Sequence, residues 1–330
     1  MGALTGLTPP PGAGLEAPPV AAPKHRRPAT LAHRAEYLAM RAAFAGLGAL
    51  SWERASALGA RLGRLGYWPL GIRRGVVERQ VAAAFPGLAR EEVRRIALGA
   101  YESLGRTSVE TALLPDLPPE RILELVDAEN WGAVERALAM GKGLIIVAGH
   151  LGNWEMGGSY VAARGVPLEV VARGQGNPLF DAYLTETRTR AGMSVVYDHE
   201  AVRRIPRALK QNHAVALLFD QGALGLASTW VPFFGRLAKT PRGPAVFALR
   251  MRAPMLFAAV VRKPHGRFTL SFEPITVEDT GDRERDVDTI VGNYTRVLEK
   301  WVRRVPEQYF WHHRRWKHQR PDTPPELGEP

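Results

Sequence analysis

Apolar residues recur at helical spacing through the first part of the chain. Between Leu31 and Leu70 they fall mostly three or four positions apart, with arginines between them, which predicts amphipathic helices. Two interpretations of this region are open: packed core helices, or helices that lie on a membrane with their arginines toward lipid phosphate. The aromatic residues Trp52, Tyr67 and Trp68 stand at the ends of these segments and favour the membrane interpretation.

A change of period marks the rest of the chain. The helical pattern continues through Glu91–Leu114, Pro119–Val126 and Trp131–Met140, after which Gly141 is suited to a left-handed cap. Short apolar, branched runs then predict strands, most of them separated by helical segments. These runs are Leu144–Ala148, Leu168–Ala172, Val195–Tyr197, Ala214–Phe219, Met255–Val261 and Phe268–Phe272. The alternation predicts an α/β fold with a mostly parallel central sheet flanked by helices, behind a helical N-terminal region.

The two ends of the chain lack this periodicity. Residues 1–30 contain seven prolines and predict a disordered leader, and residues 321–330 predict a matching disordered tail. We therefore expect one domain over residues 31–320, with membrane-associating helices over about 31–70. The longest apolar stretch, Ala42–Trp52, is bracketed by Arg41 and Glu53 and is too short to span a bilayer. Since the N-terminus also lacks the pattern of a secretory signal, we expect a cytoplasmic-side protein.

Charge and cysteine content narrow the chemistry. The net charge of +11 and pI near 10.2 predict an anionic partner: nucleic acid, an acidic carrier protein, or lipid phosphate. The chain has no cysteine, which excludes disulfides, zinc-thiolate sites and thiol nucleophiles. The C-terminal histidines have no acidic cluster beside them, so we expect no metal there, and no cofactor elsewhere.

One predicted strand leads directly into candidate catalytic residues. The segment Gly143 to Glu155 reads Gly-Leu-Ile-Ile-Val-Ala-Gly-His-Leu-Gly-Asn-Trp-Glu, so His150 follows the strand and Asn153 is suited to cap the next helix. In open α/β sheets ligands bind at the carboxyl edge, where this histidine falls. A neutral imidazole there takes a proton from a hydroxyl, and a nearby carboxylate stabilises the imidazolium that forms.

The spacing of this pair is weak as a signal. With nine His and 33 acidic residues, chance supplies roughly one histidine followed five positions later by an acid. A histidine in a loop and a glutamate in the first turn of a helix, where the helix dipole favours a carboxylate, account for the same residues without catalysis. The wider context of the chain has to decide.

Five further motifs supply that context. They are Arg173-Gly-Gln-Gly-Asn177-Pro178-Leu179, Arg188-Thr-Arg190, Phe219-Asp220-Gln221, Val231-Pro-Phe-Phe-Gly235 with Thr240, and the closing run Pro306 to Lys317. With these motifs, residues 36–320 resemble the lipid A biosynthesis lauroyl/myristoyl acyltransferase family, within the lysophospholipid acyltransferase superfamily. The hallmark of that family is His, four residues, then Asp or Glu, which corresponds here to His150 and Glu155.

The resemblance implies a function and a set of site residues. It implies a glycerolipid acyltransferase-like fold and transfer of a fatty acyl group from an acyl carrier protein or acyl-CoA to a hydroxyl of a lipid A precursor. The catalytic dyad would be His150 as general base with Glu155 as its partner. The substrate-binding residues would be Arg188, Asp220, Asn153, Arg173, Arg190 and Thr240. It also implies an anionic lipid or glycolipid acceptor, a site on the cytoplasmic face of the cell inner membrane, and no nucleic-acid partner.

Departures and alternatives accompany the resemblance. The family commonly has asparagine where this chain has Gln80, and Asp220 stands where the wider superfamily usually has glutamate. A phosphatidylinositol mannoside-like glycolipid or a lysophospholipid is an alternative acceptor. A hydrolase is another class, although no Gly-x-Ser-x-Gly motif occurs in the chain. The basic, aromatic run from His312 to Arg320 also fits a non-enzymatic membrane or nucleic-acid binding module. As part of the family signature, the same run implies a basic rim for phosphorylated lipid or carrier protein.

Overall fold

The computed structural model describes residues 28–222 and 227–330. The predicted leader therefore lies outside the described residues, apart from its last three positions. At the other end, residues 321–330 follow a defined path where the sequence predicts a disordered tail. Arg314 forms an ion pair with Glu329, and Arg236 Nη1 donates to the carbonyl of Gly328 at 2.9 Å. Opposite charges and a backbone hydrogen bond thus fasten this segment to the domain.

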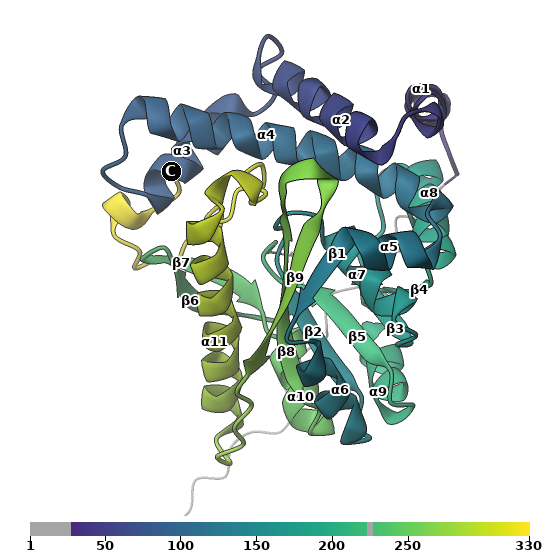
Figure 1. Ribbon diagram of the computed structural model, residues 1–330. Coiled ribbons are helices and arrows are strands. Elements are labelled where there is room, and N and C mark those ends of the chain that lie inside the picture. The colour runs from purple at the N-terminus through teal and green to yellow at the C-terminus, as the bar shows by residue number, and fades with distance from the viewer. Residues whose placement is uncertain (1–27, 223–226) are drawn as a thin grey trace, which may run out of the picture.

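Seven strands form the central sheet, in the order β1-β9-β8-β2-β5-β3-β4 (Figure 1). Their bounds are β1 Val126–Glu129, β2 Leu144–Ala148, β3 Leu168–Ala172, β4 Met193–Tyr197, β5 Ala214–Leu218, β8 Met255–Arg262 and β9 Phe268–Ile275. All neighbouring pairs are parallel except β8 and β9. The predicted α/β fold with a mostly parallel sheet is confirmed. Strand β1 was not predicted, because Val126 reads as the end of the preceding helical pattern and its strand is short.

Helices cover both faces of this sheet. One face is covered by α5 Pro119–Leu125, α6 Trp131–Ala139 and α7 Trp154–Ala163, and the other by α9 Ala201–Lys210, α10 Gly243–Met251 and α11 Arg283–Arg304. Side chains alternate along a strand, so Ile145 and Val147 of β2 belong to one core while Leu144 and Ile146 belong to the other. A second, two-stranded sheet, β6 Ser228–Phe233 with β7 Arg236–Pro241, was not predicted.

The N-terminal helices lie across one end of the sheet (Figure 1). They are α1 Leu31–Ala45, α2 Trp52–Tyr67, α3 Arg74–Ala84 and α4 Arg90–Leu113. Helices α2 and α4 touch through glycines: a Cβ on Gly105 would lie 2.1 Å from the carbonyl oxygen of Gly59. Only a residue without a side chain permits that approach. The hydroxyl of Thr107 on α4 donates at 2.8 Å to the carbonyl of Gly152, just after β2, so α4 reaches the carboxyl edge of the sheet.

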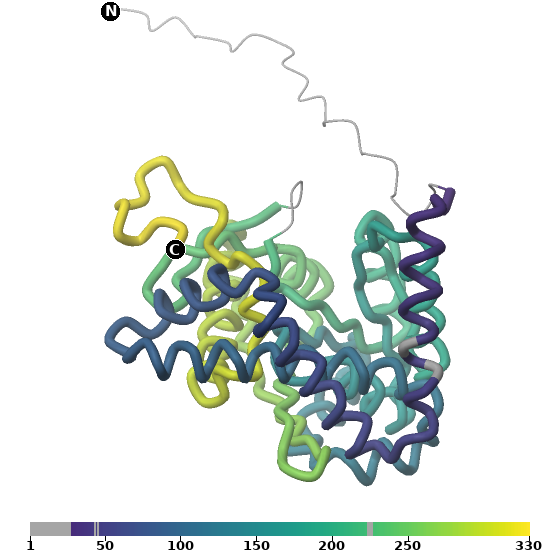
Figure 2. The backbone as a smooth tube through the Cα atoms, turned by 90° about the horizontal axis from the view of Figure 1, so that it is seen from above, coloured from purple at the N-terminus to yellow at the C-terminus, as the bar shows by residue number. Residues whose placement is uncertain are grey.

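The first helix stands apart from the other three. Seen from above, α1 runs beside α8 Pro178–Arg190 (Figure 2), and Asn177 Nδ2 donates to the carbonyl of His33 at 2.9 Å. Short 3-10 turns complete the fold: η2 Leu47–Ala49, η3 Leu114–Asp116, η4 Asp198–Glu200, η5 Pro264–Gly266, η6 Pro306–Gln308 and η7 Pro325–Leu327. Within the part of the chain that the structure describes, no helix combines the length and the apolar character needed to cross a bilayer.

Candidate active site

The register of two neighbouring strands brings a histidine and an aspartate together. Strands β2 and β5 are parallel, with Ala148 opposite Leu218. His150 and Asp220 each lie two residues beyond these positions. The Asp220 carboxylate receives two hydrogen bonds from His150: one oxygen from the backbone N–H at 2.9 Å, the other from ring Nδ1 at 2.7 Å. The contact follows from sheet topology and not from nearness in sequence.

The electrostatics of this pair fix the state of the imidazole. Burial alone would raise the pKa of Asp220, but the charge of His150 and its hydrogen bonds outweigh this effect and lower the pKa to about 2. Asp220 is therefore ionised at neutral pH and accepts hydrogen bonds only. Nδ1 of His150 must then carry a proton, which leaves the lone pair of the neutral ring on Nε2. The side chain of His150 is 16% exposed, so the ring is reachable from outside.

Glu155, the predicted partner of His150, bonds elsewhere. It lies in the first turn of α7, where its two carboxylate oxygens accept from Arg188 Nη2 at 2.6 Å and Nε at 3.1 Å. The indole N–H of Trp154 donates to the same carboxylate at 3.1 Å. Burial alone would lower the pKa of Arg188, but the Glu155 charge raises it above its usual value. The carboxylate that holds the His150 ring is therefore that of Asp220, and Glu155 holds an arginine.

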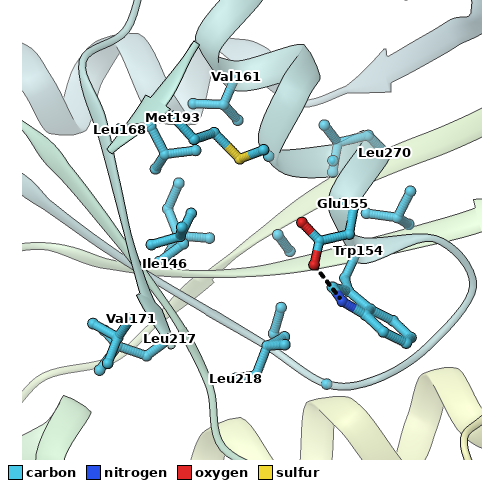
Figure 3. A pocket seen from close by; sticks show the side chains of 18 of the residues that line it. Ile146, Trp154, Glu155, Val161, Leu168, Val171, Met193, Leu217, Leu218 and Leu270 are labelled. Atoms are coloured by element: carbon cyan, nitrogen blue, oxygen red, sulfur yellow. Dashed lines mark hydrogen bonds between the residues drawn. The ribbon is translucent and has the colours of Figure 1, made fainter. Parts of the chain in front are cut away.

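An apolar cavity opens beside these groups, between α7 and the sheet (Figure 3). The space inside it that is open to water-sized molecules is about 80 Å³. Its lining includes Ile146, Ala148, Val161, Leu168, Met193, Leu218, Val260 and Leu270. Glu155 and Arg188 supply the charged groups of the lining. A hydrocarbon chain fits such a lining, because each buried methylene contributes about 0.8 kcal/mol.

Two adjacent glycines bring α7 close to the floor of this cavity. A Cβ on Gly157 would lie 2.5 Å from Val260 Cγ2, and a Cβ on Gly158 would lie 2.5 Å from Met193 Sδ. Side chains at these positions would fill space or push the helix outward. The two glycines of α7 thus determine how closely this helix approaches the side chains beside the cavity.

A smaller groove lies on the other side of Trp154, beneath α4. His150 and Trp154 line it together with residues of α4 and of the closing segment, including Thr107 and Tyr309. The ring of His150 packs edge-on against Trp154, with centroids 4.7 Å apart. Trp154 lines both spaces; His150 lines the groove, and its chain neighbours Gly149 and Leu151 line the apolar cavity.

The closing segment, Pro306 to Lys317, contacts the loop that carries His150. The backbone N–H of Phe310 donates to the carbonyl of His150 at 3.0 Å. Gln80 on α3 holds the same segment: its amide donates to the carbonyls of Trp311 and His313, at 2.6 and 2.7 Å, and accepts from the N–H of Arg315 at 2.7 Å. Gln80 thus uses its longer side chain for three backbone contacts. The sequence pattern marked it as a departure but gave no sign of this role.

Much of the closing segment is buried, whereas the sequence predicts a basic rim there. Burial lowers the pKa values of His312 and His313 to about 4, so both rings are neutral at pH 7. Arg315 is 4% exposed, and Trp316 is fully buried. The segment is buried because its aromatic residues pack into the core, so that the basic residues next to them are buried as well. Exposed charge remains at Arg314.

The other predicted substrate-binding residues fall into two groups. Asn153 and Thr240 are fully buried, and their side chains bond to protein groups: Asn153 caps α7, and Thr240 accepts from Arg315 Nη2 at 2.6 Å. Neither residue lines the apolar cavity. Arg173 and Arg190 lie at the surface in ion pairs with acidic neighbours, at 3.1 and 2.6 Å.

Comparison with known proteins adds an independent result. A family model for bacterial lipid A biosynthesis acyltransferases matches residues 26–318. The chain belongs to this family. It is 29% identical to the lipid A biosynthesis palmitoleoyltransferase of Escherichia coli (strain K12) over 261 residues, 79% of this chain and 84% of the relative. It is 28% identical to the lauroyltransferase of the same organism, with 79% and 84% covered. The resemblance seen in the sequence motifs is confirmed, and the protein is an acyltransferase.

Another relative is named for a different class of lipid. The phosphatidylinositol mannoside acyltransferase of Mycobacterium tuberculosis (strain ATCC 25618 / H37Rv) is 27% identical over 164 residues, 48% of this chain and 51% of the relative. Relatives named for lipid A are thus matched over more of the chain.

Proposed function

We propose that this acyltransferase moves a fatty acyl group from a thioester to a hydroxyl of a lipid A precursor or a related glycolipid, with His150 as general base. One observation carries the proposal: an imidazole whose Nδ1 is held by an ionised carboxylate at 2.7 Å stands beside an apolar cavity at the carboxyl edge of the sheet. The names of the relatives support the choice of acceptor. The mannoside acyltransferase relative supports a glycolipid as the alternative.

The reaction follows from the tautomer that Asp220 imposes. Nε2 of His150 takes the proton of the acceptor hydroxyl as its oxygen attacks the thioester carbonyl. The carbon–sulfur bond then breaks, and the departing sulfur receives the proton from the imidazolium. Asp220 stabilises the charged ring between these two transfers. In this scheme the acyl chain occupies the cavity beneath α7, and the acceptor hydroxyl approaches His150 from the groove beneath α4.

In this scheme Arg188, held in place by Glu155, stabilises negative charge on the substrate and transfers no proton. Arg188 is 18% exposed and is held by two hydrogen bonds at the cavity mouth, so its guanidinium keeps one orientation. A fixed guanidinium stabilises the negative oxygen that develops during acyl transfer, or a phosphate of the acceptor. Both donor forms, acyl carrier protein and acyl-CoA, are anionic and suit the net charge of +11.

His150→Ala tests the catalytic assignment. We expect this variant to lose transfer of a labelled acyl group to acceptor, with little change in thermal unfolding, because the ring is partly exposed and its loss leaves no large void. His213→Gln is the matched control: His213 also contacts a carboxylate, Glu169 at 3.4 Å, but immediately precedes β5 at the opposite edge. Turnover retained in His150→Ala would refute the assignment. Release of free fatty acid at the same rate with and without acceptor would indicate a hydrolase instead.

The exposed apolar side chains after α2 support attachment to a membrane surface, which we propose is the cytoplasmic face of the inner membrane. Trp68, Leu70 and Ile72 are 69%, 65% and 56% exposed. Apolar side chains flanked by arginines favour a lipid interface. We expect sedimentation with vesicles that contain anionic lipid, and its loss when these three residues are replaced by serine. Val202→Ser, at another exposed apolar position, is the control. Equal sedimentation of the triple variant would contradict this membrane contact.

A further inference from the structure

A buried carboxylate outside the proposed catalytic groups lies beside the loop that carries His150. Glu110, on α4, is fully buried. Its two oxygens accept from Arg262 Nη2 at 2.5 Å and Nε at 3.0 Å, and from the hydroxyl of Ser56 on α2 at 2.6 Å. The amide of Asn153 donates to the same carboxylate at 2.9 Å. One carboxylate thus joins two N-terminal helices, a strand end and the N-terminus of α7.

The charge of Glu110 is maintained in this position. Burial alone would raise its pKa, but the Arg262 charge and the hydrogen bonds from Arg262, Ser56 and Asn153 lower it below its usual value. An ionised carboxylate accepts and does not donate. Each neighbour that contacts Glu110 must therefore present a donor, and this requirement acts on Asn153.

Asn153 meets that requirement in one orientation of its amide. With Nδ2 directed at Glu110, its Oδ1 accepts from the backbone N–H of Met156 at 3.0 Å and caps α7. Rotating the amide by half a turn would set oxygen against the Glu110 carboxylate and NH₂ against the Met156 N–H. Both contacts would be repulsive, so Glu110 selects the capping orientation.

The capped turn carries the groups of the proposed mechanism. Glu155 lies in the first turn of α7, and His150 lies three residues before Asn153. The intervening Gly152 is held by Thr107, which also accepts from Arg262 Nη2 at 3.0 Å. The Glu110 cluster therefore contacts the loop at Asn153 directly and at Gly152 through Thr107.

We propose that Glu110 is a positioning residue for acyl transfer: by fixing the Asn153 amide it sets the geometry of residues 150–155. This role rests on the proposed function of His150, and it makes Glu110 necessary for turnover without contact with substrate. Displacement of reacting groups by about 1 Å is enough to lower a rate about a hundredfold. Glu110 does not line the apolar cavity.

Glu110→Gln tests the proposal at a temperature where every variant is folded. We expect kcat to fall about tenfold or more with KM for the acyl donor unchanged. Glu169→Gln is the matched control, since Glu169 is also a buried carboxylate, paired with Arg204 and His213 at the opposite edge of the sheet. It removes a buried charge and should leave kcat near that of the wild type. An unchanged kcat in Glu110→Gln, or an equal loss in the control, would overturn the proposal.

A reciprocal exchange separates positioning from stability. Asn153→Asp alone places two carboxylates against each other, and we expect a loss of kcat of at least about tenfold. In Glu110→Gln with Asn153→Asp the two carboxylates no longer oppose each other: the glutamine NH₂ donates to the new carboxylate, which still caps α7, although that NH₂ then faces Arg262 Nη2, which donates to the same oxygen of Glu110. We expect this double variant to turn over at least about threefold faster than Asn153→Asp alone. A double variant no faster than the slower single variant would overturn the proposal, also if Glu110→Gln alone does not fold.

Hydrogen–deuterium exchange gives a readout that does not need catalysis. We expect faster exchange of residues 149–157 in the Asn153→Asp variant and slower exchange in the double variant than in that single variant. Unchanged exchange in the single variant would overturn the positioning role even if acyl transfer is confirmed. Conversely, if the wild-type protein shows no acyl transfer while the variants show the expected exchange, the proposed function is refuted and the positioning contact stands.

Discussion

Two carboxylates near His150 come from different parts of the fold and bind different bases. Asp220 follows strand β5 and holds the imidazole of His150 at 2.7 Å, whereas Glu155 begins helix α7 and holds the guanidinium of Arg188 at 2.6 Å. Both acids are buried. They differ in the partner that the surrounding elements bring to them.

Closeness in sequence does not decide which acid contacts His150. Glu155 is close to His150 in sequence, but its place in the first turn of α7 directs it toward α8. Asp220 is seventy residues from His150, yet the parallel register of β2 and β5 sets it directly opposite. An acid that orients a catalytic base is therefore better sought on the adjacent strand than at a fixed distance along the chain.

Asp220→Asn should show the largest effect on turnover. The backbone N–H of His150 donates to one oxygen of Asp220, so the asparagine oxygen remains there and its NH₂ faces Nδ1. Nδ1 must then accept, which places the proton on Nε2 and leaves the ring unable to act as base. We expect kcat to fall by about 10³-fold or more. Steady-state assays with saturating donor measure it, and a loss under tenfold would contradict the His150–Asp220 assignment.

Glu155→Gln should have a smaller effect, on the order of tenfold to a hundredfold in kcat. The change loosens Arg188 but leaves the His150–Asp220 pair in place. Arg188→Lys, which keeps the charge and loses the two-pronged contact, should give a similar loss. The same assay compares all three variants. If Glu155→Gln equals Asp220→Asn, then Glu155 also serves the imidazole, and the division between the two acids is wrong.

Acid unfolding should show the smallest difference, because it involves stability alone. The pKa of Asp220 is lowered to about 2 in the folded protein. Its stabilising contribution is therefore fully present above the ordinary pKa of an unfolded aspartate and is lost as pH falls toward 2. Between pH 5 and pH 3 we expect wild type to lose about 1 kcal/mol more unfolding free energy than Asp220→Asn. Urea titrations at both pH values measure this, and parallel losses would contradict the depressed pKa.

Much of the fold was predictable because strand and helix periods are local properties. The runs that became β2, β3 and β8 were recognised from their apolar composition, and Asn153 was recognised as a helix cap. The sequence did not predict the hairpin of β6 and β7, because apolar and polar residues alternate only weakly in it and it includes proline and charged side chains. The role of Glu110 escaped as well, since an acidic residue in a long amphipathic helix reads as an exposed one.

The sequence by itself determined the family and the fold class and drew attention to His150, because motif order and periodicity can be read without knowledge of three-dimensional contacts. Only the tertiary structure decided which carboxylate meets that histidine, which predicted polar residues are buried, and where the apolar cavity lies. These depend on strand order and on helix approach at glycines, which bring together residues far apart in the chain. No local pattern specifies such pairs, because the hydrogen bonds that select them form between elements and not within one.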